Sequence, residues 1–178
     1  MYSAEYPKRL AQFNSTDKYQ RELRLLHRLL NTRPGLKVLD YGCGIGTAMK
    51  YLAPYCAIIR GYDVNNFLDK DIPANWVDDG TGKFDRIYFM HAIAHIPNIR
   101  EVVKDLVRDR LFPGGKIIVI TPNKIWLREK NGGVDIKSDD TVVEHFTGST
   151  LHDVFVDTPL KCLIGRFLAG ERLYCVAS

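Results

Sequence analysis

A run of alternating glycines places the strongest constraint on how this chain folds. Residues 36–46 read LKVLDYGCGIG, an apolar segment that ends at Asp40 and is followed by three glycines at every second position. The apolar segment is typical of a strand buried on both faces of a parallel sheet. Apolar side chains then recur with helical spacing over residues 47–52, and Pro54 ends that pattern. Strand, glycine turn and helix together predict a nucleotide-binding unit, because glycines let the backbone approach a ligand closely.

The spacing of the glycines distinguishes between possible ligands. A dinucleotide site has the pattern G-x-G-x-x-G, whereas Gly42, Gly44 and Gly46 alternate here and Thr47 stands where that pattern has its last glycine. A phosphate loop ends in G-K-S/T, which this stretch lacks. The glycine spacing therefore disfavours an NAD(P)-dependent oxidoreductase, which stays as an alternative function.

Three stretches resemble one family. VLDYGCGIGT resembles the first motif of the class I S-adenosylmethionine-dependent methyltransferases, (V/I)LDxGxGxG. Residues 111–120, LFPGGKIIVI, resemble the segment before the fifth strand of these enzymes, and residues 142–151, VVEHFTGSTL, the start of their last helix. The resemblance runs from about Leu36 to the C-terminus. It implies an α/β fold, Rossmann-like and doubly wound, with a mostly parallel sheet and a C-terminal antiparallel hairpin.

The resemblance also implies S-adenosyl-L-methionine as cofactor, with S-adenosyl-L-homocysteine as product. Asp63 follows Asp40 by 23 residues and ends a second apolar strand, where a carboxylate can bind both ribose hydroxyls. Asp78 and Asp79 are equal candidates for binding the adenine amino group, and Val64 or Trp76 for an apolar wall against the base. The predicted cofactor residues are Asp40, Tyr41, Gly42, Cys43, Gly44, Gly46, Asp63, Val64, Asp78, Asp79 and Met90.

The 178 residues are expected to form one methyltransferase domain. Residues 1–33 are predicted to be an N-terminal helical cap, with a helix capped by Asp17 that ends near Leu30. Residues 34–178 are predicted to be the Rossmann-like core. The core is abbreviated in the middle, where Ala74–Val77 are expected to form a brief third strand. The later predicted parts are a strand at 84–90, a helix at 98–112, a polar acceptor lid at 121–146 and paired strands within 159–177.

Three histidines are candidate catalytic residues. His91 and His95 lie in HAIAHIPN, which resembles the segment after the fourth strand of ubiquinone- and menaquinone-type methyltransferases, except that Ala94 replaces a glutamate. Four residues apart, they would share one face of a helix. We predict no metal site, because there is no H-E-x-x-H motif or evident third ligand. Either histidine could act as a general base or could only pack against its neighbours. His145, at the lid, is the third candidate.

Several classes of function are disfavoured. The chain lacks the (N/D/S)PP(Y/F/W) motif and the Pro-Cys dipeptide of nucleic-acid base methyltransferases, and its net charge of +4 is mild, so a nucleic-acid partner is not expected. No apolar run approaches the ~20 residues of a membrane span, and the N-terminus lacks a signal-peptide pattern. Four scattered cysteines favour a cytoplasmic protein. We expect methyl transfer to an oxygen or nitrogen of a small molecule; a catalytically inactive binding subunit of the same fold is the alternative.

Overall fold

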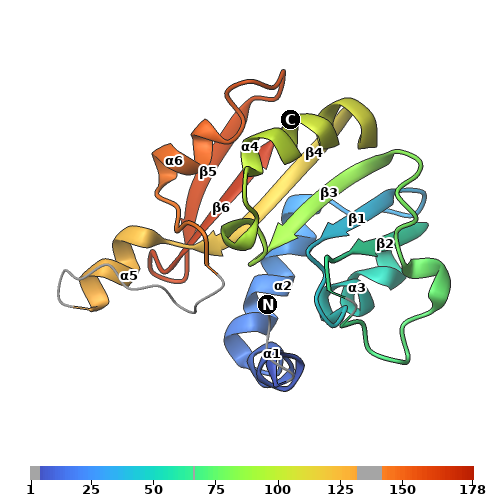
Figure 1. Cartoon of the computed structure of the whole chain (residues 1–178), viewed down its shortest axis with the longest axis horizontal. Coiled ribbons are helices and arrows are strands. Elements are labelled where there is room, and N and C mark those ends of the chain that lie inside the picture. Colours follow the sequence, from blue (N-terminus) through green and yellow to red (C-terminus); the bar gives the residue numbers. More distant parts are fainter. Residues whose placement is uncertain (1–4, 66, 132–141) are drawn as a thin grey trace.

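A six-stranded sheet with helices on both faces organises the protein (Figure 1). The computed structural model describes residues 5–65, 67–131 and 142–178. The strand order is β2-β1-β3-β4-β6-β5, in which β1 to β4 are mutually parallel and β6 runs antiparallel to both of its neighbours. The strands are β1 Lys37–Tyr41, β2 Ile58–Tyr62, β3 Phe84–Met90, β4 Leu111–Pro122, β5 Cys162–Phe167 and β6 Arg172–Ala177. The predicted fold class is therefore confirmed.

The helices are short and lie between or before the strands. They are α1 Tyr6–Asn14, α2 Asp17–Leu30, α3 Thr47–Leu52, η1 Ala53–Tyr55, η2 Ala74–Trp76, η3 Ile93–His95, α4 Ile99–Asp105, η4 Leu106–Arg110, α5 Lys124–Lys130 and α6 Gly148–Asp153. The predicted N-cap of α2 was wrong by one residue. Thr16 has an extended backbone and its side chain accepts the Tyr19 N–H at 3.3 Å, so Asp17 is already the first helical residue.

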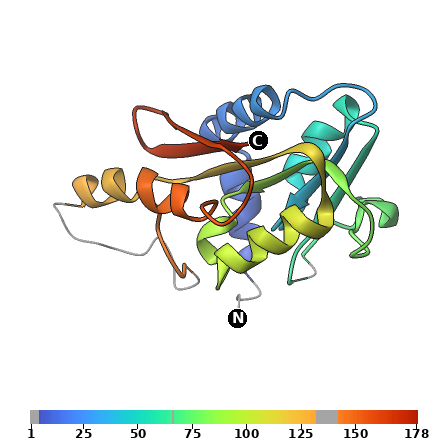
Figure 2. The same cartoon turned by 90° about the horizontal axis from the view of Figure 1, so that it is seen from above.

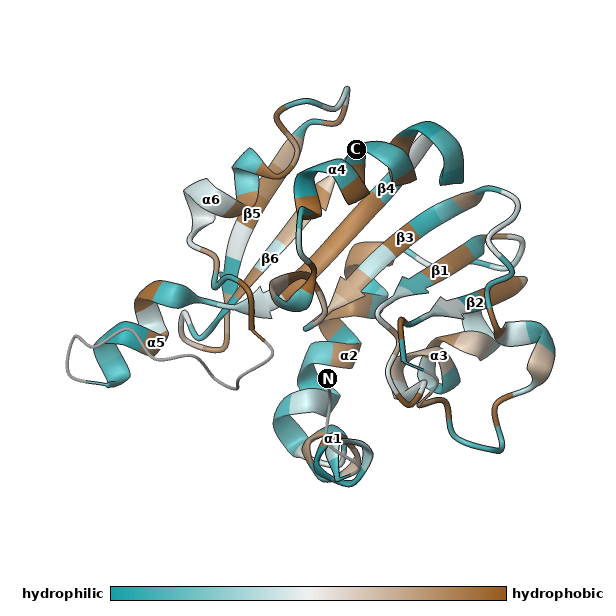
Figure 3. Ribbon diagram, in the orientation of Figure 1, coloured by the Kyte–Doolittle hydropathy of each residue, from teal (hydrophilic) through white to brown (hydrophobic). Residues whose placement is uncertain are grey.

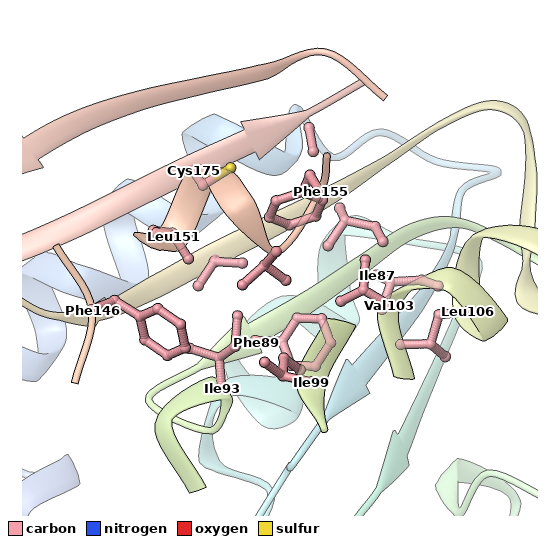
Figure 4. Close-up of a cluster of buried hydrophobic side chains, with 14 of the residues drawn as sticks. Ile87, Phe89, Ile93, Ile99, Val103, Leu106, Phe146, Leu151, Phe155 and Cys175 are labelled. Atoms are coloured by element: carbon pink, nitrogen blue, oxygen red, sulfur yellow. The ribbon is translucent and has the colours of Figure 1, made fainter. Parts of the chain in front are cut away.

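Helices lie on both sides of the sheet in Figure 2. An apolar core fills the space between the sheet and the helices on each side. Successive residues of a strand point to opposite faces. Ile118 and Ile120 thus face α2 and α3, whereas Ile117 and Val119 face α4 and α6. All four side chains are fully buried, and β4 is correspondingly apolar in Figure 3. Figure 4 shows the core between the sheet and helices α4 and α6, with Phe89, Phe146 and Phe155 among its largest side chains.

The third strand expected at Ala74–Val77, in the middle of the chain, was wrong. Residues Ala74–Trp76 form the 3-10 helix η2, and only Val77 makes an isolated parallel bridge, to Gly61. Pro73 precedes this segment and cannot donate a backbone hydrogen bond, which disfavours a ladder at this point. Among the described residues, β2 is therefore an edge strand of the sheet.

The remaining elements largely match the sequence analysis. The predicted helix at 98–112 consists of α4 and the π-helix η4, and it ends at Arg110 because Leu111 already pairs with Phe84. The lid predicted at 121–146 starts too early, because Thr121 and Pro122 are still part of β4; α5 follows, and residues 132–141 lie outside the described part. No helix in the described residues is long and apolar enough to cross a bilayer.

Candidate active site

The glycine loop lies at the carboxyl end of β1, where its backbone makes two sharp turns. Gly42 and Gly44 have φ of 84° and 53°, in the left-handed region that favours glycine. The Gly42 N–H donates to the Tyr62 carbonyl at 2.7 Å, which ties the loop to the end of β2. A Cβ at Gly42 would collide with the Cβ of Ala92, so the segment after β3 packs directly against this loop. Both glycines are thus required by the local geometry.

Asp63 holds the glycine loop from the neighbouring strand end. Its Oδ2 accepts the Gly44 N–H at 2.9 Å, and its Oδ1 accepts the Asn65 N–H at 2.8 Å. A carboxylate oxygen has two lone pairs, so each oxygen can accept a further hydrogen bond. The half-buried Asp63 side chain is therefore placed to bind a hydroxyl-bearing ligand while it keeps the loop in shape.

Asp40 lies below the loop and is 2% exposed. Burial raises the pKa of this carboxyl to about 8; the neighbouring Tyr88 hydroxyl opposes the shift, whereas the negative charge of Asp63 adds to it. Cys43 and Met90 are also buried here, and burial raises the pKa of the Cys43 thiol. Asp40 is thus a group that a bound positive charge would ionise.

The other predicted cofactor residues lie around the same edge, but with different surroundings. Tyr41 packs its ring against Tyr62 and Phe89, at centroid distances of 4.8 and 5.2 Å. Burial raises the pKa of Tyr41 to about 12. Val64 is 82% exposed. Their direct contact with a cofactor remains a prediction.

Asp78 and Asp79 both have structural partners. Asp78 is buried and accepts from Arg110 Nη2 at 2.7 Å, whereas Asp79 is exposed, pairs with Arg60 at 3.3 Å and binds Thr81. The Thr81 hydroxyl and N–H, which bind Asp79, are the main reason that its pKa falls to about 2. The choice between the two for binding adenine therefore remains open.

Helix α1 packs against the glycine loop. A Cβ at Gly44 would lie 2.8 Å from Leu10 Cδ2 of α1. The Asn14 Nδ2, at the end of α1, donates to the Thr47 hydroxyl at 2.8 Å. The Oδ1 of Asn14 is buried and has no hydrogen-bond partner in the described residues. The surroundings of the loop thus combine glycine backbone, the apolar side chain of Leu10 and one buried acceptor that has no donor in the described residues.

His91 follows β3 directly, but the helix expected to hold both His91 and His95 was wrong. The φ of His91 is 60°, so the chain turns away from a helical path, and only Ile93–His95 form a single 3-10 turn. The His91 N–H donates to the Ile120 carbonyl at 2.8 Å. Its ring Nε2 lies 2.6 Å from Glu22 Oε2. His91 therefore reaches α2 instead of sharing a face with His95.

The segments that carry His95 and His145 lie side by side. The Val143 and Glu144 N–H groups both donate to the Ala94 carbonyl, at 2.8 and 3.1 Å. Both histidines are half-buried. The Lys124 N–H donates to the Phe146 carbonyl at 2.9 Å, which fixes this segment to the start of α5. The backbone thus brings the three candidate histidines to one edge of the sheet, around the loops after β3 and β4.

Sequence reasoning missed two charged residues at this edge. Glu22 has no exposed surface, and its Oε1 accepts from Arg172 Nε at 2.7 Å. The position of Glu22 was a usable signal, because it lies on the apolar face of α2 between Tyr19 and Leu23. Its partners lie far away in sequence, and no local pattern reveals them.

The two remaining candidate sites are a metal centre and a hollow at the opposite edge of the sheet. No group of three metal-binding side chains occurs within residues 5–65, 67–131 and 142–178. A hollow lined by Lys83, Arg108, Phe112 and Pro159 lies near the amino end of β4, at the opposite edge of the sheet, and contains no predicted site residue. The carboxyl edge with its glycine loop is therefore the candidate active site.

A family comparison decides what this geometry belongs to. The family model described as a methyltransferase domain matches residues 12–163, which include the glycine loop, Asp63 and all three histidines. The chain belongs to this family. The resemblance to class I methyltransferases seen in the glycine motif is thus confirmed for this methyltransferase domain.

Curated relatives match parts of the methyltransferase domain. Tocopherol O-methyltransferase of Arabidopsis thaliana is 35% identical over 104 residues, covering 48% of this chain and 30% of that protein. Phosphoethanolamine N-methyltransferase of Triticum aestivum is 27% identical over 158 residues, covering 72% and 30% respectively. The chain spans only about a third of the length of these relatives.

Solved structures share the fold of the methyltransferase domain over nearly its whole length. An S-adenosylmethionine-dependent methyltransferase from Aquifex aeolicus has a TM-score of 0.70 at 11% identity, covering 99% of this chain and 98% of that one. DhpI in complex with SAH has a TM-score of 0.68 at 18% identity, covering 98% and 93%. These likenesses support the class I methyltransferase fold.

Proposed function

We propose that this domain transfers a methyl group from S-adenosyl-L-methionine to an oxygen or nitrogen of a small-molecule acceptor. The observation that carries the proposal is the glycine loop at the carboxyl end of β1, held by Asp63 and covered by α1. Open α/β sheets bind ligands at this edge. Family membership and the small-molecule methyltransferases among the relatives support the same reading.

The residues around the loop suit the parts of this cofactor. Asp63 would accept hydrogen bonds from the ribose hydroxyls, and the loop N–H and C=O groups would bind the amino-acid end. Asp40 and the Oδ1 of Asn14 are acceptors for a positive group. When bound, the cofactor supplies an activated methyl group, and the protein contributes position and a dry site.

The acceptor would bind between His91, His95 and the 121–146 lid, with His145 at its edge. The loops after β3 and β4 both leave the sheet beside the glycine turn. The methyl group must meet its acceptor there, at roughly 3–3.5 Å before reaction. A histidine base would take the proton of a hydroxyl or ammonium acceptor.

Calorimetry with S-adenosylhomocysteine and with NAD tests the cofactor. We expect the parent domain to bind S-adenosylhomocysteine and not NAD. Binding of NAD alone would overturn the proposal in favour of an oxidoreductase.

Asp63→Ala tests the ribose contact. A charge-assisted hydrogen bond contributes about 1.5–3 kcal/mol, so loss of one or two should weaken S-adenosylhomocysteine binding at least ~10-fold. Asp85→Ala is the control, because Asp85 likewise accepts a backbone N–H, that of Lys37 at 2.8 Å, but lies at the amino ends of the strands, away from the glycine loop. An unchanged dissociation constant for Asp63→Ala would exclude Asp63 from the cofactor site.

Turnover of His91→Ala, His95→Ala and His145→Ala tests the base. The assay uses radiolabelled S-adenosylmethionine with a panel of phenols, carboxylic acids and amines. A base variant should lose turnover and keep S-adenosylhomocysteine affinity. Parental rates in all three would remove the catalytic histidine from the proposal. Cofactor binding without any turnover would favour the inactive binding subunit.

A further inference from the structure

A buried chain of charges links α2, the turn after β3 and β6 beside the candidate active site. Glu22 is fully buried in α2, with Arg172 Nε 2.7 Å from its Oε1 and His91 Nε2 2.6 Å from its Oε2. The Arg172 side chain also reaches Glu171 at 3.2 Å, and Glu171 pairs with Lys18. Each oxygen of Glu22 thus faces a different donor.

The Glu22 carboxyl is ionised in this arrangement. Burial by itself would raise its pKa, but the hydrogen bonds and charges of His91 and Arg172 outweigh burial and lower it. An ionised carboxylate only accepts hydrogen bonds. The nitrogen of His91 that faces Glu22 must therefore carry a hydrogen, and in a neutral imidazole the lone pair then lies on Nδ1.

The His91 ring is fixed on several sides and still reachable. Phe13 meets it edge-on at 5.6 Å between ring centroids, and Tyr19 lies at 6.4 Å. Its backbone holds a left-handed φ of 60°, a conformation that is uncommon outside glycine and typical of functional sites. The side chain keeps 19% of its surface exposed. Within the described residues, Nε2 to Glu22 is the ring's one hydrogen bond.

We propose that Glu22 is a positioning residue that holds His91 in its Nε2-protonated tautomer and leaves Nδ1 to take up the acceptor's proton. This deepens the proposed function and rests on it, since the proton is the one that a hydroxyl loses as its oxygen is methylated, or that an ammonium group loses so that its nitrogen can attack the methyl group. The proton moves to Nδ1, the resulting imidazolium is stabilised by Glu22, and water later removes the proton. Among the three candidate histidines, the inference selects His91.

The other charged and titratable groups around His91 agree with this role. Tyr19 is buried, and burial, Asp40 and Glu22 all raise the pKa of its hydroxyl, so it stays protonated. Arg172 meets Glu22 on the oxygen that His91 does not use. Asp40 on β1 lies near enough to affect Tyr19. Glu22 is thus the carboxylate that pairs directly with the ring.

The first test is NMR of protein labelled with 15N in its histidine rings, which requires no acceptor. Long-range proton–nitrogen spectra distinguish the two neutral tautomers and the imidazolium, and His91→Gln assigns the signal. We expect the neutral form of parent His91 to carry its proton on Nε2. A neutral form that carries its proton on Nδ1 would overturn the proposal.

The second test compares Glu22→Gln with Glu171→Gln. Gln keeps the shape of Glu but can present either an amide oxygen or an amide N–H to the ring, so Glu22→Gln should lose the parent's preference for the Nε2-protonated tautomer. Turnover on the acceptor panel should fall with that preference. Glu171→Gln removes a charge beside the same Arg172 and should leave both nearly unchanged. The same tautomer and the same turnover in parent and Glu22→Gln would show that Glu22 only holds α2 in place.

Binding of S-adenosylhomocysteine separates the two levels of inference. If S-adenosylhomocysteine binds to the parent but His91 does not show the expected tautomer, only the role of Glu22 is refuted. Absence of binding in the parent refutes the proposed function. If Glu22→Gln does not fold, the tautomer of His91 in the parent still decides the proposal.

Discussion

At Gly44 a single backbone N–H joins the glycine loop to Asp63, and the adjoining space is filled by Leu10. A valine here would have to adopt a φ of 53°, and its Cβ would lie 2.8 Å from Leu10 Cδ2. We expect Gly44→Val to abolish detectable S-adenosylhomocysteine binding in calorimetry while the domain stays folded by circular dichroism.

Gly80→Val is the matched control for Gly44. Gly80 also has a left-handed φ, of 79°, but a Cβ there meets nothing within 4 Å. It should share the backbone strain and keep parental affinity. A folded Gly44→Val protein that binds as well as the parent would contradict the assignment of the loop.

Asp40 predicts proton release on cofactor binding. With a pKa of about 8 in the free protein, this buried carboxyl is mostly protonated at pH 7. An ammonium group nearby favours the carboxylate, so S-adenosylhomocysteine should displace a proton into the buffer. Calorimetry at pH 7 in buffers of different ionisation enthalpy should give different binding enthalpies, and Asp40→Asn should remove that dependence. A buffer-independent enthalpy for the parent would contradict the placement of the ammonium near Asp40.

At the scale of elements, α2 is capped by Thr16, whereas the sequence predicted Asp17 as its cap. Thr16→Ala removes the side chain that accepts the Tyr19 N–H and should lower the free energy of unfolding by about 1 kcal/mol. Asp17→Ala removes only a charge in the first turn of the helix, and such a charge contributes about 0.3–1 kcal/mol. It should therefore lower the free energy of unfolding by less than Thr16→Ala. Urea unfolding measures both. A larger loss for Asp17→Ala would restore Asp17 as the cap.

The sequence predicted elements best where the local pattern and the environment agree. The apolar runs at 36–40 and 84–90 became β1 and β3 because strands in the centre of a parallel sheet are buried on both faces. At Ala74–Val77 the pattern was too short, and one bridge to Gly61 is all that forms. At His91 a left-handed backbone broke the expected helix, and nothing in HAIAHIPN indicates that turn.

The candidate site also has one part whose placement the sequence predicted and another that it did not. The position of Asp63 beside the glycine loop was predictable, because each follows an apolar strand in the sequence, and the Asp63 carboxylate accepts the Gly44 N–H in the structure. Glu22 was not assigned a role because its partners are 69 and 150 residues away. Its unusual place on an apolar helix face indicated burial, but only the folded chain shows what neutralises it.

At the scale of the whole molecule, the Glu22 to Arg172 pair connects α2 to β6. Arg172→Met would leave Glu22 Oε1 buried without its partner, which should cost about 3–5 kcal/mol in the free energy of unfolding. Arg108→Met is the control, because the partners of Arg108 in the described part of the chain are the exposed Asp105 and Asp109, so its loss should change stability little. Chemical denaturation gives both values; equal losses would show that the buried pair contributes no more than a surface one.

The same pair predicts how stability depends on pH. His91 and Arg172 outweigh the effect of burial and lower the pKa of Glu22 from its ordinary 4.5, so the pair contributes stability above pH 4.5 that is lost as pH falls through the lowered value. Unfolding curves below pH 4.5 should therefore converge for the parent and Arg172→Met. A gap that stays constant in acid would assign the loss to packing instead of charge.

The pairing of α2 with β6 also has a consequence for synthesis on the ribosome. Glu22 emerges early, but its partner Arg172 is translated 150 residues later. Until then Glu22 Oε1 on the apolar face of α2 lacks its donor, and the helix cannot close over the sheet without burying a carboxylate that only His91 meets. Nascent chains arrested before β6 leaves the exit tunnel should keep α2 open to proteases and chaperones. The glycine loop would thus receive its cover only after β6 has been made.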